Sequence, residues 1–145
     1  MMKRKLLPLA LMLVWISGVA AEASVTKTAT PNSLSRISGK AISMHRVSGT
    51  DYPRGSSMSA ALVGVSWSAT SYPQSIGEFA ELCMKRQGAQ EDCHPITPGS
   101  SGFTQVFNNS LLGYASYIMI KHGQTGGPAR SLPAGSNSVT FHLSY

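Results

Sequence analysis

S-V-T-F-H-L-S-Y, from Ser138 to Tyr145, alternates apolar and polar side chains without a break. Successive side chains of a β-strand point to opposite faces of the sheet. The alternation therefore predicts a strand with one face in a core and the other in solvent. The predicted core face carries Val139, Phe141, Leu143 and Tyr145.

Short segments of the same kind recur upstream, separated by clusters of turn residues. We expect further strands within residues 40–47, 57–70, 76–85, a return arm that ends at Ile96, 103–107 and 114–122. Turn-rich connections cover 49–56 and 123–135. Residues 78–86 also fit one or two helical turns, and this alternative stays open. About six or seven short strands predict an all-β fold, a small antiparallel β-sandwich or barrel-like domain over residues 40–145.

The segment 57–70 contains two alternating sets of residues that compete for the core face. The more apolar set is Ala61, Val63, Val65 and Trp67, and we expect it to face the core. A role in a binding site is the alternative for Trp67. A core position is favoured because the indole falls on the apolar face of its strand.

Cys83 and Cys93 are the only cysteines of the chain. In an oxidising compartment an even pair predicts a disulfide. The residues between them are polar and include Gly88, which favours a hairpin turn. We therefore expect one disulfide within a hairpin, and loop-closure entropy gives about 2–3 kcal/mol for it. A redox-active pair is the alternative, but the spacing is not C-x-x-C.

The N-terminus has the pattern of a secretory signal peptide, which we place at residues 1–23. A short basic head, Met1 to Lys5, precedes an apolar run from Leu6 to Val19 and then small residues. Cleavage fits after Ala21 or after Ala23. The apolar run is too short to span a bilayer, and no second run is long enough, so the mature chain has no expected membrane segment. This predicts export to the periplasm.

Residues 24–39 are rich in serine and threonine and contain Pro31, which predicts a flexible arm before the domain. The formal charge of the whole chain is +6. Cleavage after Ala23 removes Lys3, Arg4, Lys5 and Glu22, which leaves +4. The remaining cations are scattered rather than clustered, so the sequence does not favour a nucleic-acid partner.

No set of residues has the spacing of a known catalytic or metal site. The histidines, His45, His94, His122 and His142, lack H-x-H or H-E-x-x-H partners. A three-histidine site assembled by the fold stays open, but surface or edge histidines are favoured. Glu78 and Glu81 would face opposite sides of a strand. We expect no catalytic residue, no metal ligand and no cofactor, and hence not an enzyme.

The order of several features resembles the enterobacterial flagellar protein family FlhE, roughly over residues 61–145. The resemblance rests on the strand that ends in Trp67, Pro73, the step Leu82-Cys83 and the later second cysteine. Further along, a glycine-containing segment leads to Phe103. The remaining features are Gly126-Gly127-Pro128, Leu132-Pro133 and the final strand, Val139 to Tyr145. The resemblance implies a periplasmic β-domain without catalysis that is an accessory to flagellar assembly or export.

Two functions from different classes follow. The first is a periplasmic, non-catalytic accessory protein of flagellar assembly or export, chaperone-like or gating, that acts by binding protein partners such as rod or export components. The alternative is a fimbrial subunit assembled by donor-strand exchange, because the final strand resembles the last strand of such subunits. Residues 24–39 lack the alternating apolar donor pattern, which places that alternative second. A secreted hydrolase of unfamiliar type ranks third. The sequence does not identify a binding face.

Overall fold

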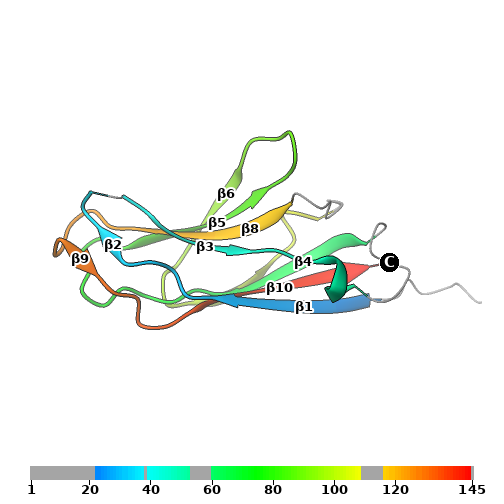
Figure 1. Cartoon of the computed structure of the whole chain (residues 1–145), viewed down its shortest axis with the longest axis horizontal. Coiled ribbons are helices and arrows are strands. Elements are labelled where there is room, and N and C mark those ends of the chain that lie inside the picture. Colours follow the sequence, from blue (N-terminus) through cyan, green and yellow to red (C-terminus); the bar gives the residue numbers. More distant parts are fainter. Residues whose placement is uncertain (1–21, 38, 53–59, 109–115, 145) are drawn as a thin grey trace, which may run out of the picture.

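The computed structural model describes residues 22–37, 39–52, 60–108 and 116–144. Two four-stranded antiparallel sheets stack face to face, in the orders β1-β10-β4-β7 and β3-β8-β5-β6, and β2-β9 forms a two-stranded sheet at one end (Figure 1). The elements are β1 (Glu22–Ala29), β2 (Leu34–Ser35), β3 (Ala41–His45), the 3-10 helix η1 (Gly49–Asp51), β4 (Ala61–Ser68), β5 (Phe79–Lys85), β6 (Asp92–Ile96), β7 (Ser101–Thr104), β8 (Tyr117–Gly123), β9 (Arg130–Ser131) and β10 (Asn137–Ser144). The expected all-β sandwich is confirmed.

The core lies between the two sheets. Strand β10 supplies Val139, Phe141 and Leu143, each with 0% of its surface exposed, so the predicted core face of this strand is confirmed at these three positions. Tyr145, the fourth predicted member, lies outside the described residues. The core cluster contains Ala60, Leu62, Val65, Ala69, Leu82, Met84, Phe107, Ile118 and Ile120 in addition. Burial of such aliphatic and aromatic side chains supplies most of the stabilisation of a small sandwich.

A β-bulge in β4 changes which of its residues face the core. Gly64 pairs with His142 and Leu62 pairs with Leu143, so Val63 is an extra residue with no partner of its own. The expected core set is therefore correct for Val65 and Trp67, which pack in or against the core. It is wrong for Ala61 and Val63, because the bulge shifts the alternation and brings Leu62 inward instead.

The expected flexible arm at 24–39 is wrong for its first part. Residues Ser24 to Ala29 belong to β1, which pairs along its whole length with β10. The sequence carries few large apolar residues here, but its threonines suit a strand, and only Val25 packs against the core. Leu34 is fully buried at the other end of the segment. The β domain therefore includes residues that the sequence assigned to the arm.

Other boundaries differ less from expectation. The open alternative of helical turns at 78–86 is resolved as a strand, since β5 covers most of it. The connection 123–135 contains the short strand β9. The expected signal peptide lies outside the described residues up to position 21, as does part of the turn cluster at 49–56. No helix in the described ranges has the length and apolar character needed to cross a bilayer.

Candidate functional site

Polar side chains are enclosed between the two sheets, where the sequence predicted only an apolar core. His45 and His122 are 1% and 0% exposed, so the expectation of surface or edge histidines is wrong for these two. Both lie on the inward face of their strands, β3 and β8. Ser43 and Asn137 are buried with them, and we call these four residues the inter-sheet network.

The network runs as a chain of hydrogen bonds from one sheet to the other. His45 Nδ1 lies 3.0 Å from the carbonyl oxygen of Lys27, on β1. His45 Nε2 lies 2.9 Å from Ser43 Oγ, which accepts a hydrogen bond of 2.8 Å from Asn137 Nδ2. Asn137 Nδ2 also lies 3.0 Å from His122 Nε2. Asn137 Oδ1 accepts from the backbone N–H of Thr70 at 2.8 Å.

This arrangement fits two neutral imidazoles. If His45 donates from Nδ1 to Lys27 O, its Nε2 can accept from the hydroxyl of Ser43. Asn137 donates one amide hydrogen to Ser43. If His122 Nε2 carries no proton, it accepts the other amide hydrogen, and it also lies 3.2 Å from Asn137 Oδ1. Burial lowers the pKa of His45 and of His122 below the ordinary value, since the charged form is desolvated. A proton on either ring would remove an acceptor that the chain uses.

Glu78 and Tyr72 extend this polar region toward the β2-β9 end. A carboxylate oxygen of Glu78 accepts a 2.9 Å hydrogen bond from the backbone N–H of Tyr72 and lies 3.9 Å from His122 Nδ1. Burial raises the pKa of the Glu78 carboxyl. Burial, followed by the nearby Glu78 charge, raises the pKa of the Tyr72 phenol. That phenol donates to Asn32 O at 2.6 Å, which anchors the chain between β1 and β2.

The Ser43–His45 contact resembles the nucleophile–base pair of a hydrolase, but its surroundings do not suit catalysis. Both residues are buried in the sandwich, so a substrate does not reach the hydroxyl. The imidazole is oriented by a backbone carbonyl, and Ser43 is already engaged with Asn137. A nucleophile needs access to its substrate as well as a base. The network acts as a polar clamp between sheets.

The two remaining histidines lie nearer the surface, as expected. His142 sits on the outer face of the first sheet, between Ser24 on β1 and Ser66 on β4, at 3.2 and 2.8 Å. Its ring also meets Phe103 edge-on. His94 Nε2 on β6 lies 2.9 Å from Asp92 Oδ1, and both side chains are well exposed. Neither histidine is in the inter-sheet network.

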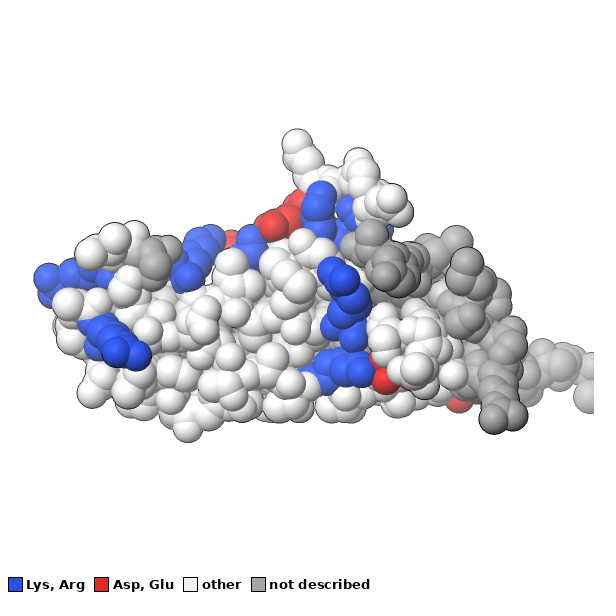
Figure 2. Space-filling view, viewed as in Figure 1, with Lys and Arg blue, Asp and Glu red and all other residues white. Residues whose placement is uncertain are grey.

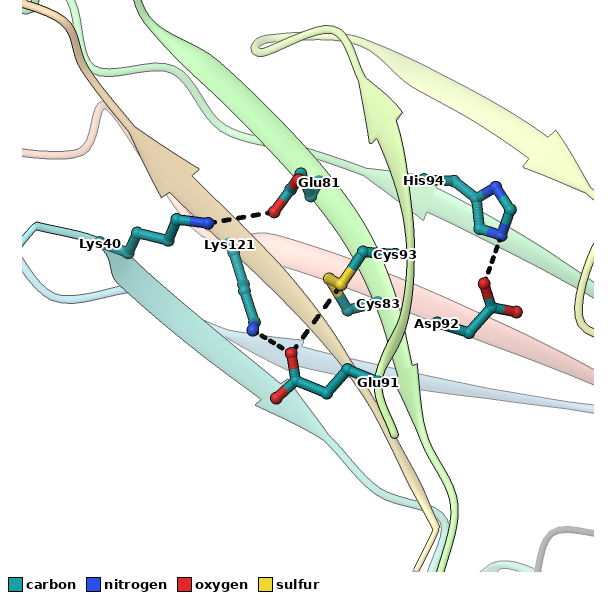
Figure 3. The surroundings of a disulfide bond; sticks show 8 residues. All are labelled: Lys40, Glu81, Cys83, Glu91, Asp92, Cys93, His94 and Lys121. Atoms are coloured by element: carbon teal, nitrogen blue, oxygen red, sulfur yellow. Dashed lines mark hydrogen bonds and ion pairs between the residues drawn. A yellow bond between two sulfur atoms is a disulfide. The ribbon is translucent and has the colours of Figure 1, made fainter. Parts of the chain in front are cut away.

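The Cys83–Cys93 disulfide is present, as the sequence predicted, and joins directly opposed residues of the β5-β6 hairpin. It lies on the outer face of the second sheet, with ion pairs around it (Figure 3). Lys121 pairs with Glu91, whose carboxylate lies 3.9 Å from Cys93 Sγ, and Lys40 pairs with Glu81 at 3.3 Å. These contacts fasten the hairpin across β8 to β3.

Glu81, Cys83 and Cys93 bring a carboxylate oxygen and two sulfurs within 4.8 Å of one another. Such a donor set would suit a soft metal ion only with thiolates. Because the two sulfurs are bonded to each other, they supply no thiolate, and Glu81 is paired with Lys40. The geometry thus favours a structural bridge.

Nothing in the sequence pattern singles out Ser43 or Asn137, because single polar residues on strands are ordinary surface residues in most sheets. Their roles come from contacts between segments far apart in the chain: Asn137 bonds to Ser43 across 94 positions.

The chain matches no known family model and no curated protein sequence. It does match solved structures, among them the crystal structure of FLHE. That match has a TM-score of 0.62 and 21% sequence identity, and covers 87% of this chain and 100% of the other. The resemblance to FlhE that the sequence indicated is therefore confirmed for the fold.

Proposed function

We propose that this protein is exported to the periplasm and acts there as a non-catalytic accessory of flagellar assembly or export. The observation that carries the proposal is the FLHE-like fold over most of the chain.

The disulfide and the N-terminal sequence support the periplasmic part of the proposal. A disulfide persists in an oxidising compartment, and residues 1–23 have the pattern of an export signal. In the proposed pathway, the signal is cleaved on export and the Cys83–Cys93 bond forms afterwards.

The non-catalytic part is supported by the polar groups of the described residues. The clusters that resemble chemistry, Ser43 with His45 and Glu81 with the two cysteines, are enclosed or already bonded. We therefore propose that the protein acts by binding other proteins, in a chaperone-like or gating role, with rod or export components as the partners to test.

The fimbrial alternative gains no support from the structure. Donor-strand exchange requires a sandwich that lacks a strand. Here β10 is paired with β1 on one side and with β4 on the other, all within one chain.

A deletion strain tests the proposal. We expect impaired swimming or misplaced flagellar subunits, restored by the full chain but not by a chain that lacks residues 1–21. Fractionation of the complemented strain should recover an oxidised protein in the periplasm. Normal motility and normal flagella in the deletion strain would contradict the flagellar role, and function without the export signal would contradict the periplasmic one.

A further inference from the structure

The end of the sandwich at β2 and β9 carries a pocket of about 330 Å³. Its lining residues are Ser35, Arg36, Gly39, Gln124, Thr125 and Gly126. We call it the tip pocket. Its volume is in the range that holds a small ligand or a few side chains of a bound peptide.

Backbone contacts give the tip pocket its shape. Arg36 N donates to Ala129 O, and Gly39, at φ +76°, donates to Ser35 O, so the chain after β2 turns around one side. On the other side, Ile76 is bridged to Gly126. The pocket is therefore formed by segments whose hydrogen bonds fix them in the fold.

Two side chains at the tip pocket offer N–H donors to a ligand. Arg36 Nε and Nη2 donate to Gly127 O at 3.1 and 2.5 Å, which anchors the guanidinium through only part of its five donors. Gln124 Oε1 accepts from Ser131, but Gln124 Nε2 is buried without a hydrogen-bond partner. A buried donor without an acceptor is costly, so a rotation of the Gln124 side chain that brings Nε2 into the tip pocket would be favoured by a hydrogen bond to a ligand acceptor.

Two arginines, Arg36 and Arg130, give this end of the sandwich positive charge. Arg130 on β9 pairs in register with Ser35, next to Arg36. No described acidic residue forms an ion pair with Arg36 or Arg130. On the face shown in Figure 2, the end that carries β2 and β9 has blue side chains and no red ones. The ligand best suited to it is an anion that accepts hydrogen bonds, such as a carboxylate.

Apolar side chains accompany these cations. Ile37 follows Arg36 and is 99% exposed, Ile76 is 66% exposed beside Gly126, and Leu132 follows β9 at 55%. Exposed apolar groups next to arginine are typical of the surfaces that bind proteins. We call Ile37, Ile76, Leu132, Arg36 and Arg130 the tip surface.

We propose that the tip surface binds an acidic segment of a partner protein, with a carboxylate of that segment in the tip pocket and its apolar side chains on the isoleucines and the leucine. This inference rests on the proposed function, because it assumes that the protein acts by binding another protein. The recognition is by charge and shape: Arg36 and the Gln124 amide hold the carboxylate, and Arg130 attracts the flanking acidic residues.

A concave site favours a protein segment over a membrane. An anionic bilayer would meet the cations and apolar side chains at a broad surface and would not use a pocket wall such as Gln124. The response of the Gln124 side-chain amide therefore separates these two occupants.

The test uses the mature protein purified from the periplasm, labelled with nitrogen-15. The probe is a capped peptide in which leucine alternates with glutamate, and the matched peptide has glutamine in place of each glutamate. We expect the acidic peptide to shift the backbone amides of the tip pocket and the side-chain amide of Gln124. We expect at least tenfold weaker binding of the glutamine peptide.

The variants are matched for charge. Arg36→Gln with Arg130→Gln should weaken binding of the acidic peptide at least tenfold. Arg46→Gln with Lys85→Gln removes the same amount of charge at the ends of β3 and β5 that lie away from the tip pocket. This control should change the affinity for the acidic peptide less than twofold. Gln124→Leu should weaken binding of the acidic peptide severalfold.

Equal binding of both peptides, or equal loss in both double variants, would overturn the proposal. So would binding to phosphatidylglycerol vesicles that depends on Arg36 and Arg130 when the acidic peptide does not bind. These results are independent of the motility experiment. Absence of peptide binding with a motility defect in the deletion strain rejects only the tip inference. Peptide binding with normal motility rejects only the flagellar role.

Discussion

Asn137 Nδ2, at the start of β10, lies 3.0 Å from His122 Nε2 on β8, so a single amide connects the two sheets of the sandwich. The same amide group bonds Ser43 on β3 and the backbone of Thr70 after β4. An apolar core permits sheets to shift relative to each other at modest cost, whereas a buried hydrogen-bond network is satisfied in one arrangement. We infer that Asn137 fixes how the two sheets are aligned.

Asn137→Ala should lower the free energy of unfolding by about 2–4 kcal/mol, because it leaves the buried groups of three partners without their hydrogen bonds. Urea unfolding measures this change. Asn137→Asp is the informative companion, since it keeps an acceptor for Thr70 but cannot donate to Ser43 or His122. We expect it to raise the pKa of His122 and to be least harmful at low pH. A loss below about 0.5 kcal/mol for the alanine variant would contradict the clamp.

Stability should fall as the pH drops below about 6.5, the ordinary histidine pKa. Burial lowers the pKa of His45 and His122 in the folded protein. Between this lowered pKa and the ordinary value of 6.5, the unfolded chain therefore binds more protons than the folded protein. The contribution of the two neutral histidines to the free energy of unfolding is fully present above pH 6.5, and it is lost as the pH falls from 6.5 through the lowered pKa. Urea unfolding at several pH values, with imidazole NMR titrations of both residues, measures it.

The Glu78 carboxyl changes stability with pH in the opposite direction to the two histidines, and it does so at lower pH. Its raised pKa means that the folded protein binds the proton more tightly above about 4.5, so its contribution is lost as the pH rises through the folded value. Glu78→Gln removes that effect and isolates the histidine part. An unchanged free energy of unfolding from pH 7.5 to 5.5 in this variant would exclude the histidine effect.

Replacing Cys83 and Cys93 together by alanine should cost about 2–3 kcal/mol, because the unfolded chain regains the entropy of a ten-residue loop. The fold should persist, since β5 also pairs with β8 along its length. Circular dichroism shows whether the fold persists, and urea unfolding measures the loss in the free energy of unfolding. Dithiothreitol should have the same effect on the native protein and none on the double variant.

Because of the bulge in β4, alanine substitution should cost more stability at Leu62 than at Val63, the reverse of what the sequence alternation predicts. Leu62→Ala should cost about 2–5 kcal/mol, because Leu62 is fully buried in the core cluster. Val63→Ala should cost less than about 1 kcal/mol, because Val63 is the unpaired residue of the bulge and only partly buried. The reverse order of the two losses would place Val63 in the core and remove the bulge.

If the chain is exported as proposed, mass spectrometry of the periplasmic protein should give a chain that starts at Glu22. Cleavage after Ala23 would remove Glu22 and Ala23, which pair with Ser144 and Leu143 in the register of β1 with β10. Cleavage after Ala21 keeps the whole strand. A mature chain that starts at Ser24, with unchanged stability when the two residues are added back, would show that these pairs contribute nothing.

The sequence by itself determined the parts of this protein that depend on local pattern. Alternation in Ser138 to Tyr145 predicted both the strand and its buried face, since side chains of a strand alternate wherever it pairs. The spacing and loop composition of Cys83 and Cys93 predicted the hairpin bridge in the same way. The order of such features was also enough to indicate an FlhE-like fold.

Only the tertiary structure decided the features that depend on distant partners. The strand β1 forms because β10, more than 100 positions away, presents an edge to it. Val63 leaves the core because the pairing with β10 skips one residue, and nothing in the alternation of β4 records that shift. His45 and His122 are buried because the opposite sheet brings Asn137 to them, and the tip pocket exists because β2, β9 and the turn at Gly126 meet there. Local sequence sets which side of a strand is apolar, but long-range packing sets what that side meets.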